Sequence, residues 1–418
     1  MPFSFSTALS GLRASSNALG VTGNNIANAN TTAFKSSSII FADVFANSTG
    51  VRLNGGGGAI QIGTGVSTAA TPTNFSQGNL ADGGSATAAA IQGNGFFVVK
   101  NSSGAQLYTR AGDFSINRDG LLVTPSGDEA QGYAAVDGVI PPGTALSSVK
   151  IPIGETIAPV VTSEVTVKMN LNSADAPGSV FHSPMQVFDS KGTSHTLDVT
   201  YSKQADGSYV IAATLDGNAA TIDTGTAAPT LVFDSNGLLT SPTSLVITPD
   251  QTQLDGATLP SLNVNLFQRN PDGTIGSANI TGFAAPSGVA SVQQNGFAAG
   301  SLTGLSISAT HDGVLSAVYS NGQVRPIAQF ALASFNSQDG LGRLGGNNFG
   351  ETLASGQASI GTPGSGGRGS VIGAELEQSN VDIATEFTDL IVAQRSFQAN
   401  SRVISTISQT LQDLMQNL

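Results

Sequence analysis

The chain has 418 residues, 51 of them glycine, and a formal net charge of −12 without any cysteine. This length predicts two or three domains, and the low charged content of 11% with so much glycine favours strands and turns over helices. The acidity disfavours nucleic acid and anionic membranes as partners, because both bind through Lys and Arg, and the lack of cysteine excludes disulfides and thiolate sites.

The first 30 residues predict an amphipathic helix. Large apolar residues recur every seven positions at Phe5, Leu12, Leu19 and Ile26, with Leu9 beside them, which places them on one helical face. No basic segment precedes an apolar run, so a cleavable secretory signal is not expected. No run reaches the roughly 18 apolar residues of a membrane span, so membrane insertion is not expected either.

Two segments rich in Gly, Ser and Asn separate the ends of the chain from its middle. They are residues 31–72, which include the run "NSTGVRLNGGGGAIQIGTGVSTAA", and residues 360–378. This composition is typical of flexible or loosely ordered chain. We therefore expect connectors that hold the terminal helices away from the middle.

The middle of the chain predicts an all-β region. Apolar residues such as Phe97, Val99, Leu107 and Phe114 sit in short strand-like runs that are separated by turn residues. Five dipeptides predict hairpin turns: Asp119-Gly120, Asp206-Gly207, Asp216-Gly217, Asp312-Gly313 and Asn321-Gly322.

The β region divides into two nested domains. Residues 139–161 and 270–283 look like crossings between them. We expect an inner β domain of residues 73–145 plus 283–359 and an outer β domain of residues 146–282. The predicted fold class is mainly β with α-helical termini and nested, discontinuous domains.

The last forty residues predict a second, longer amphipathic helix. A column of large apolar residues repeats every seven positions from Ile383 to Leu418 without a slip. A straight helix drifts by about 20° per heptad, so this column suggests coiled-coil-like packing. Residues 1–30 and 379–418 would form a helical assembly domain, because exposed stripes need partners, either each other or copies of the same chain.

The predicted assembly interface consists of Phe5, Leu9, Leu12, Leu19, Ile26, Ile383, Phe387, Leu390, Ile391, Phe397, Ile404, Ile407, Leu411, Leu414 and Leu418. The two ends are also weakly complementary in charge. Arg13 and Lys35 are the charged residues before Asp43, whereas six acids accompany Arg395 and Arg402 from Val371 onward.

No motif predicts a catalytic, cofactor or metal site. There is no phosphate-binding GxxxxGK[ST], and "SINRDG" (Ser115 to Gly120) lacks the acidic ligands of a calcium loop and fits a hairpin turn better. His182, His195 and His311 have no metal-ligand spacing, and we expect them to be solvent-exposed or on edge strands.

The sequence also gives no sign of a catalytic serine with its base. Ser194 and His195 are neighbours on a strand, so their side chains point to opposite faces and cannot act as a nucleophile and its base. The sequence alone does not exclude the paired catalytic carboxylates of a glycosidase, because the two residues can be distant in the chain.

Four segments resemble the bacterial flagellar rod and hook proteins. They are "NNIANANTTAFKSSSIIFADVF" (24–45), "GNGFFVV" (93–99), "YTRAGDFSINRDGLLV" (108–123) and "SNVDIATEFTDLIVAQRSFQANSRVI" (379–404). Within that family, "MQVFDSKGTSHTLDVTYSK" (185–203) resembles the hook branch, whereas the distal rod branch looks shorter and lacks the outer β domain. One departure is Ala33, where the family often has glycine, and it puts the turn after the first helix in doubt.

The resemblance implies a structural protein and neither an enzyme nor a cofactor-binding protein. Such a protein is exported unprocessed by the flagellar type III apparatus and polymerises under a cap into a curved extracellular tube. The implied partners are further hook subunits, the distal rod protein, the hook cap, the hook–filament junction protein and the export apparatus. The alternatives are a distal rod protein, a secreted β-rich adhesin and a secreted hydrolase.

Overall fold

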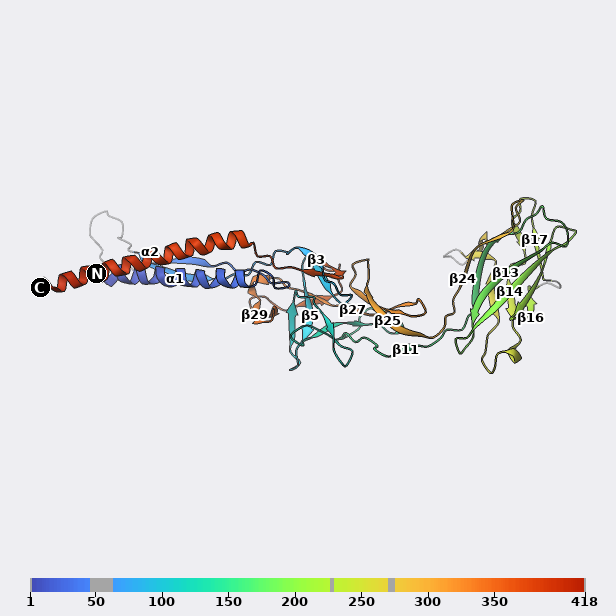
Figure 1. Ribbon diagram of the computed structural model, residues 1–418, viewed down its shortest axis with the longest axis horizontal. Coiled ribbons are helices and arrows are strands. Elements are labelled where there is room, and N and C mark those ends of the chain that lie inside the picture. The colour runs from blue at the N-terminus through green and yellow to red at the C-terminus, as the bar shows by residue number, and fades with distance from the viewer. Residues whose placement is uncertain (1, 46–62, 226–228, 270–274, 417–418) are drawn as a thin grey trace. The chain divides into compact units, whose positions relative to one another are not determined.

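Two long helices stand at the two ends of a chain that is otherwise built from strands. The computed structural model describes residues 2–45, 63–225, 229–269 and 275–416 (Figure 1). Helix α1 is Pro2–Ala27 and helix α2 is Ile383–Gln416. The described residues between them form strands, loops and two short 3₁₀ turns, Gln251–Gln253 and Gln338–Gly340. The predicted fold class is confirmed.

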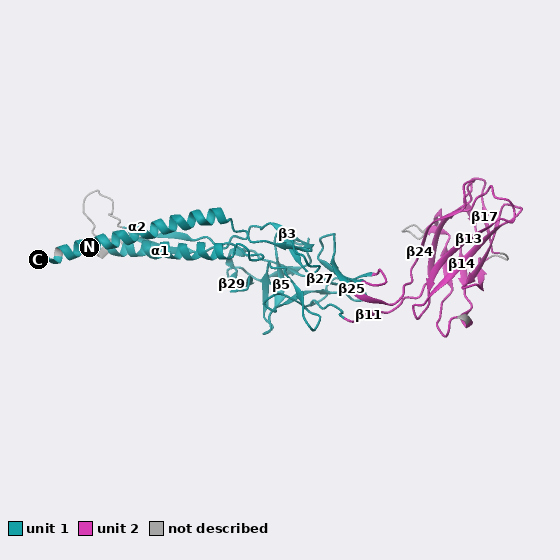
Figure 2. Ribbon diagram, in the orientation of Figure 1, with its two compact units in different colours: residues 1–153, 304–318, 324–418 teal, residues 154–303, 319–323 magenta. Residues whose placement is uncertain are grey.

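The chain divides into two compact units (Figure 2). Unit 1 is residues 1–153, 304–318 and 324–418, and unit 2 is residues 154–303 and 319–323. Unit 2 is inserted within unit 1 in the sequence, and the chain returns to unit 1 after residue 303, whereas the predicted outer β domain ends at residue 282. The cause is strand β24 (Gly288–Gln294), which pairs with β12 (Glu164–Asn170) inside unit 2.

Unit 1 contains the terminal helices and the inner β structure. Its strands are β1 (Ile40–Phe45), β2 (Gly63–Ala70), β3 (Leu80–Asp82), β4 (Ala89–Gln92), β5 (Phe96–Lys100), β6 (Gln106–Thr109), β7 (Ser115–Ile116), β8 (Leu122–Val123), β9 (Glu129–Ala134), β10 (Leu146–Ser148), β26 (Val314–Tyr319), β27 (Val324–Phe330), β28 (Leu332–Ser334), β29 (Gly342–Gly345), β30 (Asn348–Gly350), β31 (Ser359–Gly361), β32 (Ser370–Gly373) and β33 (Glu375–Glu377). Strand β25 (Gly300–Ile307) begins in unit 2 and ends in unit 1.

Strand β5 is the centre of the unit 1 sheet, whose order runs β26-β27-β9-β5-β6-β30-β29. Its first four residues are all buried, so both faces of the sheet are covered. On one face the ring of Phe96 contacts Phe349 at 5.7 Å between centroids. On the other face Phe97 meets Phe114 at 5.3 Å and Phe330 at 5.5 Å. These aromatic clusters form a core on each side, which makes the sheet a firm base for the helices.

The described parts of the predicted connectors contain paired strands, which corrects the expectation of loosely ordered chain. Strand β1 pairs antiparallel with β2, and β32 pairs with β4. Strand β2 also lies along α1, where the Val66 amide donates to Ser10 Oγ at 3.1 Å and Asn17 Nδ2 donates to Thr68 Oγ1 at 3.2 Å. Pairing satisfies the backbone groups of these polar segments, which composition alone does not reveal. Residues 46–62 of the first connector lie outside the described residues.

Unit 2 is a β domain with its own core. Its strands are β11 (Thr156–Ile157), β12, β13 (Val180–Phe188), β14 (Ser194–Lys203), β15 (Tyr209–Leu215), β16 (Asn218–Asp223), β17 (Thr230–Phe233), β18 (Leu239–Ser241), β19 (Leu245–Thr248), β20 (Leu262–Asn265), β21 (Phe267–Arg269), β22 (Ile275–Ala278), β23 (Ile280–Thr281) and β24. The main path is β13-β14-β15-β16-β19-β20-β12-β23. Alternate residues of β14, including Leu197, Val199 and Tyr201, point into the core.

Four of the predicted hairpin turns lie where the dipeptides place them, whereas the turn before β26 lies at residues 309–310 and Asp312 forms a β-bridge with Val371. The tightest is Asp216-Gly217, which joins β15 to β16 with φ angles of 49° and 85°. Both angles are positive, as a type I′ turn requires, and Asp and Gly tolerate this region. The sequence "SINRDG" also forms the turn of the β7–β8 hairpin.

His195 differs from the expectation of an exposed or edge-strand histidine. It lies on β14, which pairs on both sides, and its side chain is only 11% exposed. The ring nitrogens contact Asp216 Oδ2 at 2.7 Å and Asp189 Oδ2 at 3.3 Å. Burial alone lowers the pKa of His195, but the hydrogen bonds to the two aspartates outweigh burial and raise this pKa above its ordinary 6.5.

Unit 2 is expected to lose stability as pH rises above about 6.5. Because the pKa of His195 is higher in the folded chain than in the unfolded chain, the stabilisation is complete below 6.5 and disappears as pH rises through the folded value. His195→Gln should cost about 1 to 3 kcal/mol at pH 5.5, where charged hydrogen bonds are lost, and less at pH 8.5. Urea unfolding of both proteins at the two pH values measures this, and an equal loss at both would contradict it.

Candidate assembly surface of the terminal helices

The two helices pair in antiparallel fashion within one chain. Gly11 of α1 faces Asn400 of α2, where an added Cβ would lie 2.9 Å from the Asn400 amide nitrogen. Further along, Asn25 Nδ2 donates to Glu386 Oε1 at 2.9 Å. Residue numbers thus rise on α1 as they fall on α2. The absence of a Cβ at Gly11 leaves room for the Asn400 side chain, which would have to shift if a larger residue stood there.

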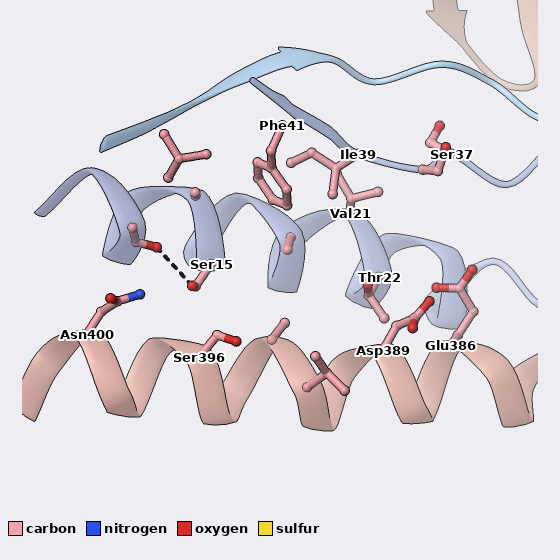
Figure 3. A pocket seen from close by; sticks show the side chains of 17 residues that line it. Ser15, Val21, Thr22, Ser37, Ile39, Phe41, Glu386, Asp389, Ser396 and Asn400 are labelled. Carbon is pink, nitrogen blue, oxygen red and sulfur yellow. Dashed lines mark hydrogen bonds between the residues drawn. The ribbon is translucent and has the colours of Figure 1, made fainter. Parts of the chain in front are cut away.

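The contact between the helices is made by small and polar side chains. Figure 3 shows a groove that runs between α1 and α2 and has a volume of about 470 Å³. It is lined by Gly11, Ala14, Ser15, Ala18, Val21, Thr22, Ser37, Ser38, Ile39, Phe41, Val66, Glu386, Asp389, Val392, Ala393, Ser396 and Asn400. None of the 15 residues of the predicted assembly interface is in this lining. On each helix, half-buried members of the columns such as Leu12 and Leu390 lie beside this lining, about 100° or less around the helix from Gly11 and Ala393.

The predicted interface residues are only partly covered by the chain itself. Phe5, Ile383, Phe387, Ile391 and Leu411 are exposed. Those that are half-buried are Leu9, Leu12, Leu19, Ile26, Leu390, Phe397, Ile404 and Ile407. The side chain of Leu414 and the whole of Leu418 lie outside the described residues. Burying one such side chain is worth about 1.5 to 3 kcal/mol, so this surface favours association.

Helix α2 begins at a well-made cap. The Asp382 carboxylate accepts from the amides of Ala384 at 2.9 Å and Thr385 at 3.3 Å. An aspartate at this position satisfies free amides of the first turn and complements the helix dipole. The cap fixes where the helix starts and therefore which side chains face outward.

A buried ionic cluster joins the bases of both helices to the sheet. Lys35, eight residues past α1, donates to Glu377 Oε1 at 2.5 Å, and Arg110 Nη1 lies 3.3 Å from Glu377 Oε2. The Lys35 and Glu377 side chains are 0% exposed. Arg110 Nη2 also donates to the Gly93 carbonyl, and the guanidinium lies over the ring of Phe96. Burial lowers the pKa of Lys35, and the attraction of Glu377 partly offsets it.

Neighbouring hydrogen bonds extend this anchor. Asn380, just before α2, accepts from the Ser36 amide at 2.8 Å and donates to the Asn74 carbonyl at 2.8 Å. Ala33 donates its amide to the Glu377 carbonyl at 2.7 Å. Its φ of 56° is in the left-handed region that glycine adopts readily, so this turn holds an alanine in a conformation that favours glycine.

The sequence did not single out Glu377 or Asn25. The signal that was present is that Lys35 and Arg110 are isolated cations inside two of the segments that carried the family resemblance. The positions of Lys35 and Arg110 in the sequence do not show which acidic residue pairs with them. Among the described residues, no group of three His, Asp or Glu side chains is arranged to hold a metal ion, and no helix is long and apolar enough to cross a membrane.

Four protein-family profiles match the sequence. Flagella basal body rod protein matches residues 5–35, and the flagellar hook protein FlgE/F/G D1 domain matches residues 90–170. The flagellar basal body protein FlaE D2 domain matches residues 160–297, and the flagellar basal body rod FlgEFG protein C-terminal matches residues 374–417. The matches cover both helices and both units.

Curated relatives align with the chain over nearly its full length. It is 33% identical to flagellar hook protein FlgE of Salmonella typhimurium over 426 residues, which covers 99% of each chain. It is 35% identical to FlgE of Treponema pallidum over 461 residues, with 99% and 98% covered. The crystal structure of Helicobacter pylori flagellar hook protein FlgE2 is similar in fold, with a TM-score of 0.51 at 16% identity over 72% of this chain and 100% of that one.

Proposed function

Because the chain belongs to the flagellar hook protein family, we propose that its terminal helices are the surface through which its copies polymerise. The chain is a structural subunit of the bacterial flagellar hook, lies in the hook attached to the basal body, and serves motility. This assignment replaces the distal rod and adhesin alternatives.

One observation carries the proposal. Five large apolar residues of the predicted interface, Phe5, Ile383, Phe387, Ile391 and Leu411, are exposed in one chain, and the other described members are half-buried. Phe387 is 49% exposed and Met415 is 78% exposed. An apolar surface of this kind on a secreted chain is unfavourable in water and becomes favourable when copies stack. Packing of the terminal helices of neighbouring copies would then give the hook a stiff inner wall.

The two-unit construction supports the role of a universal joint. Unit 2 has its own apolar core of 24 buried residues, among them Leu197 and Ile247, so it can keep its fold while contacts at its surface change. Subunits held by their helices could then slide at unit 2 as the curved tube rotates. Torque would pass from rod to filament through the helical wall.

The partners of such a subunit follow from its place in the flagellum. We expect the chain to contact further hook subunits, the distal rod protein, the hook cap and the hook–filament junction protein, after passage through the flagellar type III export apparatus. Helices whose apolar faces are complete only in the polymer suit export as an unfolded chain. No catalytic role is assigned to any residue.

Removal of the helices is expected to abolish polymerisation and leave the β units folded. Full-length chain should sediment as polymer, whereas a chain of residues 31–378 should sediment as monomer at the same concentration. This shorter chain keeps Lys35, Arg110 and Glu377, and therefore the ionic anchor. Far-UV circular dichroism checks that it is folded. Polymer formation by the folded, shortened chain would contradict the proposal.

A further inference from the structure

The groove between α1 and α2 has apolar walls and one acidic end. Ile39 and Phe41 at the start of β1, together with Val392 of α2, line it, and Phe41 and Val392 are 43% and 58% exposed. Glu386 and Asp389, one turn apart on α2, stand at one end and point into the space between the helices (Figure 3). The groove thus combines an uncovered apolar surface with two carboxylates.

Nothing in the described part of the chain balances these two carboxylates. Neither Glu386 nor Asp389 is in an ion pair there, and the hydrogen bond that Glu386 accepts comes from the neutral amide of Asn25. Burial and the nearby Asp389 raise the pKa of Glu386, although the Asn25 hydrogen bond lowers it. A cation from outside the chain would relieve this repulsion.

The two arginines of α2, Arg395 and Arg402, are on the face that points away from the groove. At about 100° per residue, Arg395 lies roughly opposite Ala393, and Arg402 lies roughly opposite Asn400. Both of those neighbours line the groove, whereas both arginines are exposed and without an ion pair among the described residues. Arg13 of α1 is different, because it lies beside β2 in a hollow with Ser67 and Thr68.

We propose that the occupant of this groove is a second copy of the chain, whose α2 places its arginine face, Arg395 and Arg402, against Glu386 and Asp389. This inference rests on the proposed function and adds the register-setting contact between subunits. A guanidinium can pair with the carboxylates while its alkyl stem covers Phe41 and Val392. The groove and the arginine face are different surfaces, so each copy can offer one to the next, and such a head-to-tail contact propagates as a helical polymer wherever its rotation does not close a ring.

Charge exchange tests this contact in cells that lack their own hook protein. Glu386→Arg with Asp389→Arg, and separately Arg395→Glu with Arg402→Glu, should each reduce the number of hooks at least about ten-fold, because like charges then face each other across the contact. The chain with all four substitutions should regain at least about half of the hooks. Electron microscopy of isolated basal bodies counts them, and the secreted amount of each variant is measured alongside.

A neutral variant at the same positions distinguishes an effect of charge repulsion from an effect on the fold. Glu386→Gln with Asp389→Asn keeps a carbonyl acceptor for Asn25 and should weaken assembly less than the reversal does. If a reversed variant is poorly secreted, the purified full-length chains are used: each reversed chain alone should stay monomeric, and an equimolar mixture of the two should co-sediment as polymer.

Two results overturn the inference without touching the proposed function. One is hooks at native number in both reversed variants, and the other is failure of the fourfold variant or of the mixture to regain assembly while the native chain polymerises. If the native full-length chain and the chain of residues 31–378 polymerised equally, the proposed function itself would fail, and the two failures are thereby distinguished.

Discussion

Replacing Glu377 with glutamine is expected to destabilise unit 1 by about 3 to 5 kcal/mol, the usual cost of removing one partner from a buried ion pair. Glutamine has nearly the same size, so packing changes little. It leaves Lys35 and Arg110 buried without a counter-charge, and its NH₂ group faces the donors of one cation while its carbonyl oxygen can accept from the other. Because Lys35 follows α1 and Glu377 precedes α2, the bases of both helices should loosen together.

Trypsin cleavage after Lys35 and Arg110 measures this loss of stability. Lys35 and Arg110 are trypsin sites that the fold protects, since their side chains are 0% and 2% exposed. In Glu377→Gln the rate of cleavage after these two residues should rise about 100-fold or more, because cleavage follows the open population and every 1.4 kcal/mol is a factor of about ten. Mass spectrometry identifies the new termini at Ser36 and Ala111.

Glu375, two residues before Glu377, provides the control substitution. Glu375 lies in the same strand β33, is only half-buried, and has no ion pair among the described residues. Glu375→Gln should change stability by less than about 0.5 kcal/mol and leave both sites protected. If Glu377→Gln were as resistant to trypsin as this control, the ionic cluster would not be the anchor of the helices.

Phe387→Asp and Leu390→Asp are each expected to abolish hook formation while the secreted chain stays folded. Phe387 is already 49% exposed in one chain, so the monomer loses little. In the polymer the change forfeits about 1.5 to 3 kcal/mol of burial per subunit and adds the cost of covering a carboxylate. The affinity between subunits should therefore fall at least about 100-fold.

The matched controls keep an apolar side chain at the same positions. Phe387→Leu and Leu390→Met conserve most of the buried area and should still give hooks. Electron microscopy scores hooks, and limited proteolysis of the secreted protein confirms that the β units are folded. Normal hooks in either aspartate variant would refute the apolar column as an assembly surface.

Local sequence patterns predicted the types of element well. The seven-residue column from Ile383 depends on the helical repeat, and the turn at Asp216-Gly217 depends on which residues accept a positive φ. Both are properties of a few adjacent residues, so the sequence shows them directly. The mainly β class with helical ends follows from these patterns alone.

The connectors and the return to unit 1 were harder to predict. Strand β2 is an ordered strand because β1 and α1 supply partners for its backbone and side chains, and neither partner is apparent from its Gly- and Thr-rich composition. Strand β24 belongs to unit 2 because it pairs with β12, more than one hundred residues earlier. Such pairings depend on which segments meet in space.

The amino-acid sequence by itself determined that the chain has two amphipathic ends and which large residues form their stripes. Only the tertiary structure decided that the two helices of one chain pair with each other, with Gly11 against Asn400, and that stripe residues such as Phe387 stay exposed. Likewise, only folding brings Lys35 to Glu377 across 342 positions of the chain. The physical reason is that periodicity fixes the faces of a helix, whereas the choice of face that is buried depends on shape and charge of segments far away in the sequence.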